Sequence, residues 1–450
     1  MTESHFSRIA VEILARAKRR GATGADVVVA DGEHLSVQVR LSAVDRLTKA
    51  REKRLGLRVF FGARSASAST SDFSGEALDT LVSDTCALAA AVIEDPVSGL
   101  PEAVVMATDL PDLDVYDATA LSTDAHIELA RRAEQAAMAA DARITNSEGG
   151  DCNSASGRVV LANSHGFVGE YQSSSFSISV SPIASAPDSQ GMQRDYWYAS
   201  DRKFARLESP ESVGQEAARR TVRRLGARKV STGRVPVVFD QEMAAGLLGN
   251  LCHAASGYAL YKGASFLIGK LGERIAAEQI TVYDDGRLPG GHGSRPFDGE
   301  GLPTRKTTIV ERGVLQSYLL DTYSAKKLGL TSTGNASRGV GEAPSVGPTN
   351  LFLLPSSVSP EDIIRSVQQG LYVTELIGFG INMVTGDYSR GAAGFWIENG
   401  ELVYPVEEIT IAGNLTQMLK GIEMVGKDLQ FRGRIASPTI KISEMMIAGN

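Results

Sequence analysis

Several residue types and patterns are scarce in this 450-residue sequence, and each scarcity excludes a class of protein. The three cysteines, Cys86, Cys152 and Cys252, lie far apart and form no CxxC pair, which is typical of reduced thiols and excludes a disulfide framework. No hydrophobic run approaches the about 18 residues of a membrane-spanning helix, and the polar start of the chain does not resemble a signal peptide. We therefore expect a cytoplasmic protein that does not bind a membrane.

Signatures of nucleic-acid, nucleotide and common hydrolase sites are also missing. The 46 Lys and Arg are outnumbered by 53 Asp and Glu, so the net charge is −7 and the basic excess of a nucleic-acid-binding protein is absent. The sequence contains no GxxxxGK[ST] loop, no GxGxxG entering a helix and no GxSxG. The six histidines never fall within one helical turn of each other, which argues against a metal site built on a single helix.

The periodicity of the remaining sequence predicts an α+β protein. Hydrophobic residues make up 43% and charged residues 22%, the usual mix for a globular chain. We expect an N-terminal α+β domain over residues 1–226, with a possible sub-boundary in the irregular connection 95–122, followed by a β-rich C-terminal domain over 227–450. Long antiparallel strands are expected at 157–162, 167–171 and 173–180. In the last of these, Phe176, Ile178 and Val180 alternate with serines and so predict one buried face.

Two hairpins are predicted in the C-terminal half. One joins strands 307–311 and 314–320 around Arg312-Gly313. The other joins 395–398 and 401–404 around Asn399-Gly400, a pair that favours the positive φ of a two-residue turn.

Two charged segments allow more than one interpretation. The segment Gly286–Gly301 holds six glycines and could cradle an anion or present metal ligands, but we favour a mobile surface loop, because loops gather glycine. Six arginines between positions 219 and 234 could bind phosphate, but we favour a solvated helix face with a basic end. The charged residues in or next to the glycine-rich segment are Asp284, Asp285, His292, Arg295, Asp298 and Glu300.

A helix expected over 242–255 carries the most informative pattern. Cys252 and His253 are adjacent, so their side chains diverge by about 100° and do not favour a zinc site. Gly246, Gly249 and His253 share the side opposite the apolar face, and the two glycines cost the helix about 2 kcal/mol relative to alanine. This glycine stripe predicts either a groove for a peptide or partner backbone, or a close helix crossing inside the fold.

The C-terminal third resembles the TldD/PmbA family, and within it the PmbA (TldE) branch. The resemblance is carried by residues Leu315–Asn335, Thr385–Gly400 and Glu401–Asn414, and the order of helices and strands agrees along nearly the whole chain. It implies a cytoplasmic metallopeptidase complex of two related subunits that cleaves unstructured peptides, in peptide maturation and antitoxin degradation. In that family the TldD-type subunit carries HExxxH on a helix, and a C-terminal cysteine completes its zinc site.

This chain departs from the family's metal motif. The positions that correspond to the two histidines and the glutamate are Gly249, Ala254 and Asn250, and no cysteine follows Cys252. Two imidazoles, a base and a thiolate are therefore missing, and with them the family's means of activating a zinc-bound water. The resemblance thus implies that this chain holds no metal or cofactor and that the zinc belongs to its partner.

Three functions remain open. The first is a non-catalytic subunit that forms a heterodimer with a TldD-type paralogue bearing HExxxH and holds an unstructured peptide, with a homodimer possible in isolation. The second is a metallopeptidase with a non-standard site built from His253, His292 and nearby carboxylates, which requires the Gly286–Gly301 segment to fold over the helix. The third is a regulatory module that binds proteins, since the family also bears an old label as a modulator of DNA gyrase.

Overall fold

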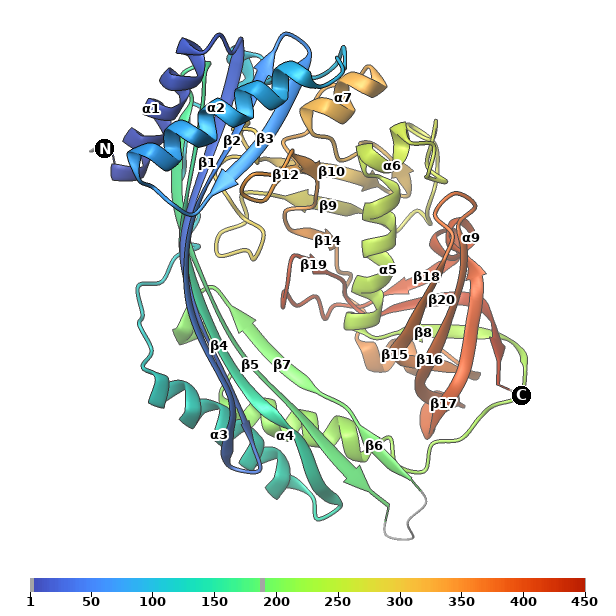
Figure 1. Ribbon diagram of the computed structural model, residues 1–450. Coiled ribbons are helices and arrows are strands. Elements are labelled where there is room, and N and C mark those ends of the chain that lie inside the picture. The colour runs from blue at the N-terminus through green and yellow to red at the C-terminus, as the bar shows by residue number, and fades with distance from the viewer. Residues whose placement is uncertain (1–3, 187–190, 450) are drawn as a thin grey trace.

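Four strands of 17 to 20 residues make up most of the N-terminal sheet of the computed structural model, which describes residues 4–186 and 191–449 (Figure 1). At about 3.3 Å per residue, each strand is about 60 Å long. The sheet has the order β3-β2-β1-β4-β5-β6, and β7 also pairs with β5. We call it the long sheet. Its strands are β1 (Gly24–Arg40), β2 (Ala43–Phe61), β3 (Arg64–Thr70), β4 (Ile144–Asn163), β5 (Val168–Ser185), β6 (Met192–Arg194) and β7 (Trp197–Asp201).

Two pairs of helices cover opposite ends of the same face of the long sheet (Figure 1). Val27 of β1 packs in one hydrophobic core with α1 (His5–Arg19) and α2 (Gly75–Ala91). Val37, which alternation places on the same face, packs with α3 (Thr123–Ala140) and α4 (Pro210–Val222). The helices begin at serine caps, since Ser4, Ser74, Ser122 and Ser209 each accept a hydrogen bond from a first-turn backbone N–H.

The serine-rich segment is a strand with one buried face, as predicted, but it is longer than expected. Ile178 and Val180 are buried in the core beneath α3 and α4, and Phe176 is buried beside Phe204, whereas the serines between them are half-buried on the opposite face. The predicted strands 167–171 and 173–180 are one strand, β5, because Gln172 keeps its pairing with Arg158 of β4. Between α2 and α3 the chain is irregular except for one 3-10 turn, η1 (Ala103–Val105).

The C-terminal half, as far as the structure describes it, contains two larger sheets around one core and the two-stranded sheet β12-β13. Six strands in the order β17-β16-β15-β8-β20-β18, with an added β17–β20 pairing, close a small barrel, and five strands form the sheet β11-β10-β9-β14-β19. The mixed α+β architecture with a β-rich C-terminal region is therefore confirmed. The strands are β8 (Gly233–Phe239), β9 (Val282–Asp285), β10 (Lys306–Glu311), β11 (Val314–Leu315), β12 (Ala336–Ser337), β13 (Ser345–Val346), β14 (Leu351–Leu353), β15 (Gln369–Ile381), β16 (Asp387–Glu398), β17 (Glu401–Asn414), β18 (Ile422–Val425), β19 (Ile435–Ala436) and β20 (Ile440–Ala448).

Short helices connect these strands, and one longer helix runs through the core. The longer one is α5 (Gln241–Ala254), which follows β8 directly and contacts β19, β14 and β15 (Figure 1). Along residues 4–186 and 191–449, no helix is long and apolar enough to cross a membrane. The short helices are η2 (Phe204–Arg206), α6 (Gly257–Tyr261), α7 (Thr322–Leu328), α8 (Pro360–Arg365) and α9 (Leu415–Lys420).

One predicted hairpin is confirmed and the other is wrong in its second strand. Asn399 and Gly400 have φ of 52° and 80° and join β16 to β17. After Arg312-Gly313, however, β11 ends at Leu315 instead of continuing to Leu320. The backbone leaves the sheet there, and the N–H of Leu319 donates to the carbonyl of Ala255 at 2.9 Å, at the end of α5.

The prediction of a surface loop over Gly286–Gly301 is also wrong, because most of this segment is buried. The ring of Phe297 lies 5.2 Å from that of Phe167, at the turn between β4 and β5. Its glycines permit close packing, since a Cβ at Gly293 would lie 1.9 Å from the carbonyl oxygen of Thr349. The glycine content therefore reflects close backbone approach and not an exposed loop.

Candidate functional site

Helix α5 is positioned by its first residues and by its apolar face. Asp240 caps the helix and accepts a hydrogen bond from the N–H of Met243 at 2.9 Å. Leu247, Leu248 and Leu251 are buried in the core that the two C-terminal sheets share. The helix is thus fixed along one side, and what lies on its other side decides its chemistry.

The other side, the glycine face, consists of Gly246, Gly249 and His253, and it is open. A Cβ at Gly246 would meet no heavy atom within 4 Å, and one at Gly249 would meet only Cδ1 of Ile435, at 3.7 Å. His253 is exposed. The predicted alternative of a helix crossing inside the fold is therefore wrong for the part of the chain that the structure describes, because no backbone packs against these glycines.

The residues at the metal-motif positions do not fit a metal ion. The side chains of Gly249 and Ala254 contain no atom that could coordinate a metal ion, and that of Asn250 offers only an amide. Cys252 points into the core, where burial raises the pKa of its thiol to about 12, so it remains protonated at neutral pH. In the described residues, no three His, Cys, Asp or Glu side chains gather in a way that could hold a metal ion.

The glycine-rich segment does not bring its charged residues to α5 as a ligand set. Asp284 accepts hydrogen bonds from Asn335 at 2.6 Å and from the Thr349 hydroxyl at 2.9 Å. Asp298 accepts from three backbone N–H groups. His292 is half-buried beside Arg202, and burial followed by that guanidinium lowers its pKa. These groups therefore stabilise the segment itself. Glu300 does not face α5 but lines a separate pocket.

The long sheet approaches the start of α5 through a tyrosine. The hydroxyl of Tyr198, on β7, donates to Oε2 of Glu242 at 3.0 Å. Both residues line a cavity of about 260 Å³ that also reaches Tyr196 and residues 374–376 of β15. The cavity therefore joins the half-buried serine side of the long sheet to the first turn of α5.

In the described part of the chain, strand β15 has a neighbouring strand on only one side at this cavity. On one side it pairs with β16 along most of its length, but on the other side β8 pairs with it only over Leu371–Val373 and then turns into α5. Within the described residues, no strand pairs with β15 on that side beyond Val373. A strand edge of this kind can bind an extended peptide through its backbone.

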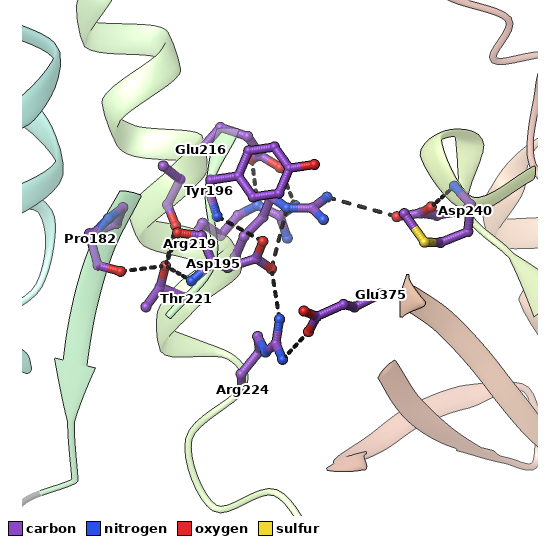
Figure 2. A network of polar contacts seen from close by, with 12 residues as sticks. Pro182, Asp195, Tyr196, Glu216, Arg219, Thr221, Arg224, Asp240 and Glu375 are labelled. Carbon is purple, nitrogen blue, oxygen red and sulfur yellow. Dashed lines mark hydrogen bonds and ion pairs between the residues drawn. The ribbon is translucent and has the colours of Figure 1, made fainter. Parts of the chain in front are cut away.

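The prediction of a solvated arginine face is wrong for Arg220 of α4 and for Arg224, which follows that helix, because both are engaged with buried or interdomain carboxylates. Arg219, Arg228 and Arg234 are exposed, as predicted. Arg224 contacts Glu375 of β15 and lies 3.7 Å from Oδ2 of Asp195, and Arg220 lies 3.5 Å from the same oxygen (Figure 2). Arg220 also lies 3.8 Å from Oδ2 of Asp240, the cap of α5, whose pKa burial raises to about 6. The two arginines thus tie the long sheet to both α5 and β15.

The sequence gives only a partial signal for this cluster. Arg220 and Arg224 are four residues apart and therefore share a helix face, which could have suggested a common acidic partner. The partners Asp195 and Glu375 lie 29 and 151 residues from Arg224, and nothing in local spacing connects them.

Comparison with known proteins identifies the class. Three family models match in order along the chain: the PmbA/TldA metallopeptidase domain 1 at residues 25–90, the central domain at 116–225 and the C-terminal domain at 232–449. The chain belongs to the PmbA/TldD family of metallopeptidases.

Its relatives place it near the PmbA branch. It is 42% identical to the metalloprotease PmbA of Escherichia coli O157:H7, over 95% of this chain and 92% of that protein. It is 30% identical to a metalloprotease TldD homologue of Buchnera aphidicola, over 52% of each chain. The crystal structure of TldE from Thermococcus kodakarensis has the same fold, with a TM-score of 0.88, 23% identity, and coverage of 98% of this chain and all of that one.

Proposed function

We propose that this chain is the non-catalytic partner subunit of a zinc metallopeptidase complex of the TldD/TldE type. The observation that supports this most directly is the glycine face of α5, which is open and lacks the donors of a zinc site at Gly249, Asn250 and Ala254. The zinc and its activated water belong to a TldD-type paralogue with HExxxH. This chain builds part of the chamber around it and forms a heterodimer with it.

The same proposal assigns peptide binding to the region beside α5. Unstructured peptides offer backbone N–H and C=O groups, which the one-sided edge of β15 beyond Val373 can pair without reading sequence. The serine side of β5 offers hydroxyls that donate and accept. This suits peptide maturation and antitoxin degradation, in which the substrate is an extended chain.

The test is cleavage of an unfolded peptide by three samples: this chain, its HExxxH-bearing paralogue, and the two mixed. We expect activity only in the mixture, abolished by a chelator. Chelator-sensitive activity and stoichiometric metal in this chain alone would contradict the proposal and favour the alternative of a metallopeptidase with a site built on His253 and His292. Formation of the complex without any cleavage would favour the regulatory module.

A variant tests the glycine face within that mixture. Gly249→Leu places a side chain where only Ile435 is near, so the isolated chain should keep its fold while cleavage by the mixture falls at least tenfold. Ala87→Leu, at an exposed position of α2, is the matched control and should retain full cleavage. Full activity of Gly249→Leu would remove the glycine face from the proposal.

A further inference from the structure

A second and larger cavity lies between the β2–β3 end of the long sheet and helices α6 and α7, which stand beside that end in Figure 1. Its volume is about 600 Å³, within the range of small-molecule sites. We call it the tyrosine pocket. The lining residues that matter here are Arg58, Tyr258, Tyr261, Glu300, Asp321 and Tyr323.

Two buried carboxylates in this pocket form no ion pair of their own within the described residues. Glu300 and Asp321 are 4% and 3% exposed, and in the described part of the chain neither forms an ion pair. Within that part, Glu300 accepts one hydrogen bond, from the N–H of Thr322 at 2.8 Å, and Asp321 accepts through Oδ1 alone, from the N–H and the hydroxyl of Ser324 as the cap of α7. A carboxylate can accept about four. The floor therefore holds unused hydrogen-bonding capacity.

The guanidiniums of Arg58 and Arg338 are paired with Asp26. Arg58 donates through Nε to Oδ2 of Asp26 at 2.9 Å, and Arg338 donates to the other oxygen of Asp26 at 2.7 Å. The guanidiniums of Arg58, Arg338 and Arg295 and the carboxylates of Asp26, Asp298, Glu300 and Asp321 give 3 − 4 = −1 around the floor when all are ionised. Burial, followed by repulsion from Asp298, raises the pKa of Glu300 to about 7, and the charge of Arg58 offsets these two effects only in part.

The walls are aromatic and the rim is basic. The Tyr258 and Tyr261 rings are 5.5 Å apart and those of Tyr261 and Tyr323 are 5.7 Å apart, and such ring faces attract cations. Lys327, 5.2 Å from the Tyr323 ring, is paired with Asp95 at 3.1 Å, whereas the exposed ammonium of Lys262, 5.6 Å from the Tyr261 ring, forms no ion pair within the described residues. A negative floor beneath the uncompensated ammonium of Lys262 favours a zwitterion over a polycation.

We propose that the tyrosine pocket binds a small zwitterion with a primary ammonium, such as a short peptide, whose ammonium lies between Glu300 and Asp321 and whose carboxylate points toward Lys262. This site is separate from the glycine face of α5 and does not depend on the proposed function. Because its walls come from both halves of the chain, the ligand would hold the long sheet against the C-terminal region.

The test is calorimetric titration of the full-length protein with trialanine at pH 7.5. We expect binding of trialanine with a free amino terminus, and at least tenfold weaker binding of acetyl-trialanine and of trialanine to Glu300→Gln. Glu401→Gln, which makes the same change at an exposed hairpin position, should bind like the unmodified chain. Gly249→Leu should also bind normally, which separates this site from the glycine face.

Spermidine and cadaverine serve as amines that lack a carboxylate. Weaker binding of these amines than of trialanine supports the zwitterion, whereas tighter binding would overturn it in favour of a polycation site. Equal binding of trialanine and its acetylated form, or no loss in Glu300→Gln, would overturn the ammonium site altogether. Tyr258→Ala provides a second variant, because Tyr258 is exposed and its loss leaves the core intact, and it should weaken trialanine binding several-fold.

Discussion

Replacing the glycines of α5 by alanine should stabilise the isolated chain. Glycine in a helix interior costs about 1 kcal/mol relative to alanine, because it leaves the unfolded backbone more freedom to lose. A Cβ at Gly246 would meet no atom within 4 Å, and at Gly249 it would make an ordinary contact of 3.7 Å with Ile435. No steric term opposes the gain, so the double variant should be about 2 kcal/mol more stable.

Scanning calorimetry measures this gain. With an unfolding entropy of about 2.1 cal/mol/K per residue, 450 residues give about 1 kcal/mol/K, so the melting temperature should rise by about 2 °C. Gly214→Ala is the matched control, because Gly214 also lies inside a helix, α4, but its Cβ would lie 2.3 Å from the carbonyl oxygen of Ala133. That variant should lose at least 1 kcal/mol through overpacking.

The result that would refute the reasoning is a loss of stability in Gly246→Ala or Gly249→Ala comparable to that in Gly214→Ala. It would mean that the chain itself packs against this face. A gain in stability accompanied by a loss of cleavage in the mixture would instead show that the two glycines serve a partner or a peptide.

Three further predictions concern buried polar groups. Cys252 should resist alkylation by iodoacetamide in the native state at pH 8 and react only after unfolding, because its thiol is buried with a pKa of about 12. In urea unfolding, Arg224→Ala should lower the free energy of unfolding by about 2 kcal/mol, because Asp195 stays buried with one partner fewer. The control is Arg234→Ala, which removes an exposed ion pair and should change the free energy of unfolding by less than about 1 kcal/mol. The pKa of Asp240 is raised to about 6 from an ordinary 3.8, so this group stabilises the fold below about pH 4 and loses that contribution as the pH rises through 6. Asp240→Asn keeps the helix cap but does not titrate. Its free energy of unfolding in urea, relative to that of the unmodified chain, should therefore rise by about 1 to 3 kcal/mol between pH 4 and pH 7. If the difference in unfolding free energy between the two chains were the same at both pH values, the burial of Asp240 would be contradicted.

The sequence was sufficient for those features that depend on near neighbours. Alternation at Phe176, Ile178 and Val180 predicts a strand with one buried face, and Asn399-Gly400 predicts a turn, because both depend on residues a few positions apart. The apolar face of α5 follows from 3.6-residue spacing in the same way. Local rules therefore identified the class of fold and the helix that matters.

Features that depend on distant pairing could not be predicted. Asp26 binds Arg338, 312 positions away, and Arg224 binds Glu375, 151 positions away, so both arginines look like surface residues in the sequence. Glycines in the segment 286–301 suggest an exposed loop, yet Gly293 is there because the backbone of Thr349 comes so close. In each case the partner that determines burial is invisible until the chain is folded.

Helix α5 has two destabilising features that a helix serving only the core would not need: two interior glycines and a cluster of buried charges at its start. Gly246 and Gly249 weaken it by about 2 kcal/mol, and the buried cluster around Arg220 fixes its capped end against the long sheet. A helix that served only the core would gain from alanine on its open side and would not require so many buried charges at its start. Both features are explained if a backbone or a partner surface approaches the glycine face closely. Such an approach requires a helix with glycines on that face and with a fixed position. At its metal-motif positions this helix lacks the side chains of a zinc site, yet the contacts that fix its position, namely the Asp240 cap, the Arg220 cluster and the apolar core, are all present.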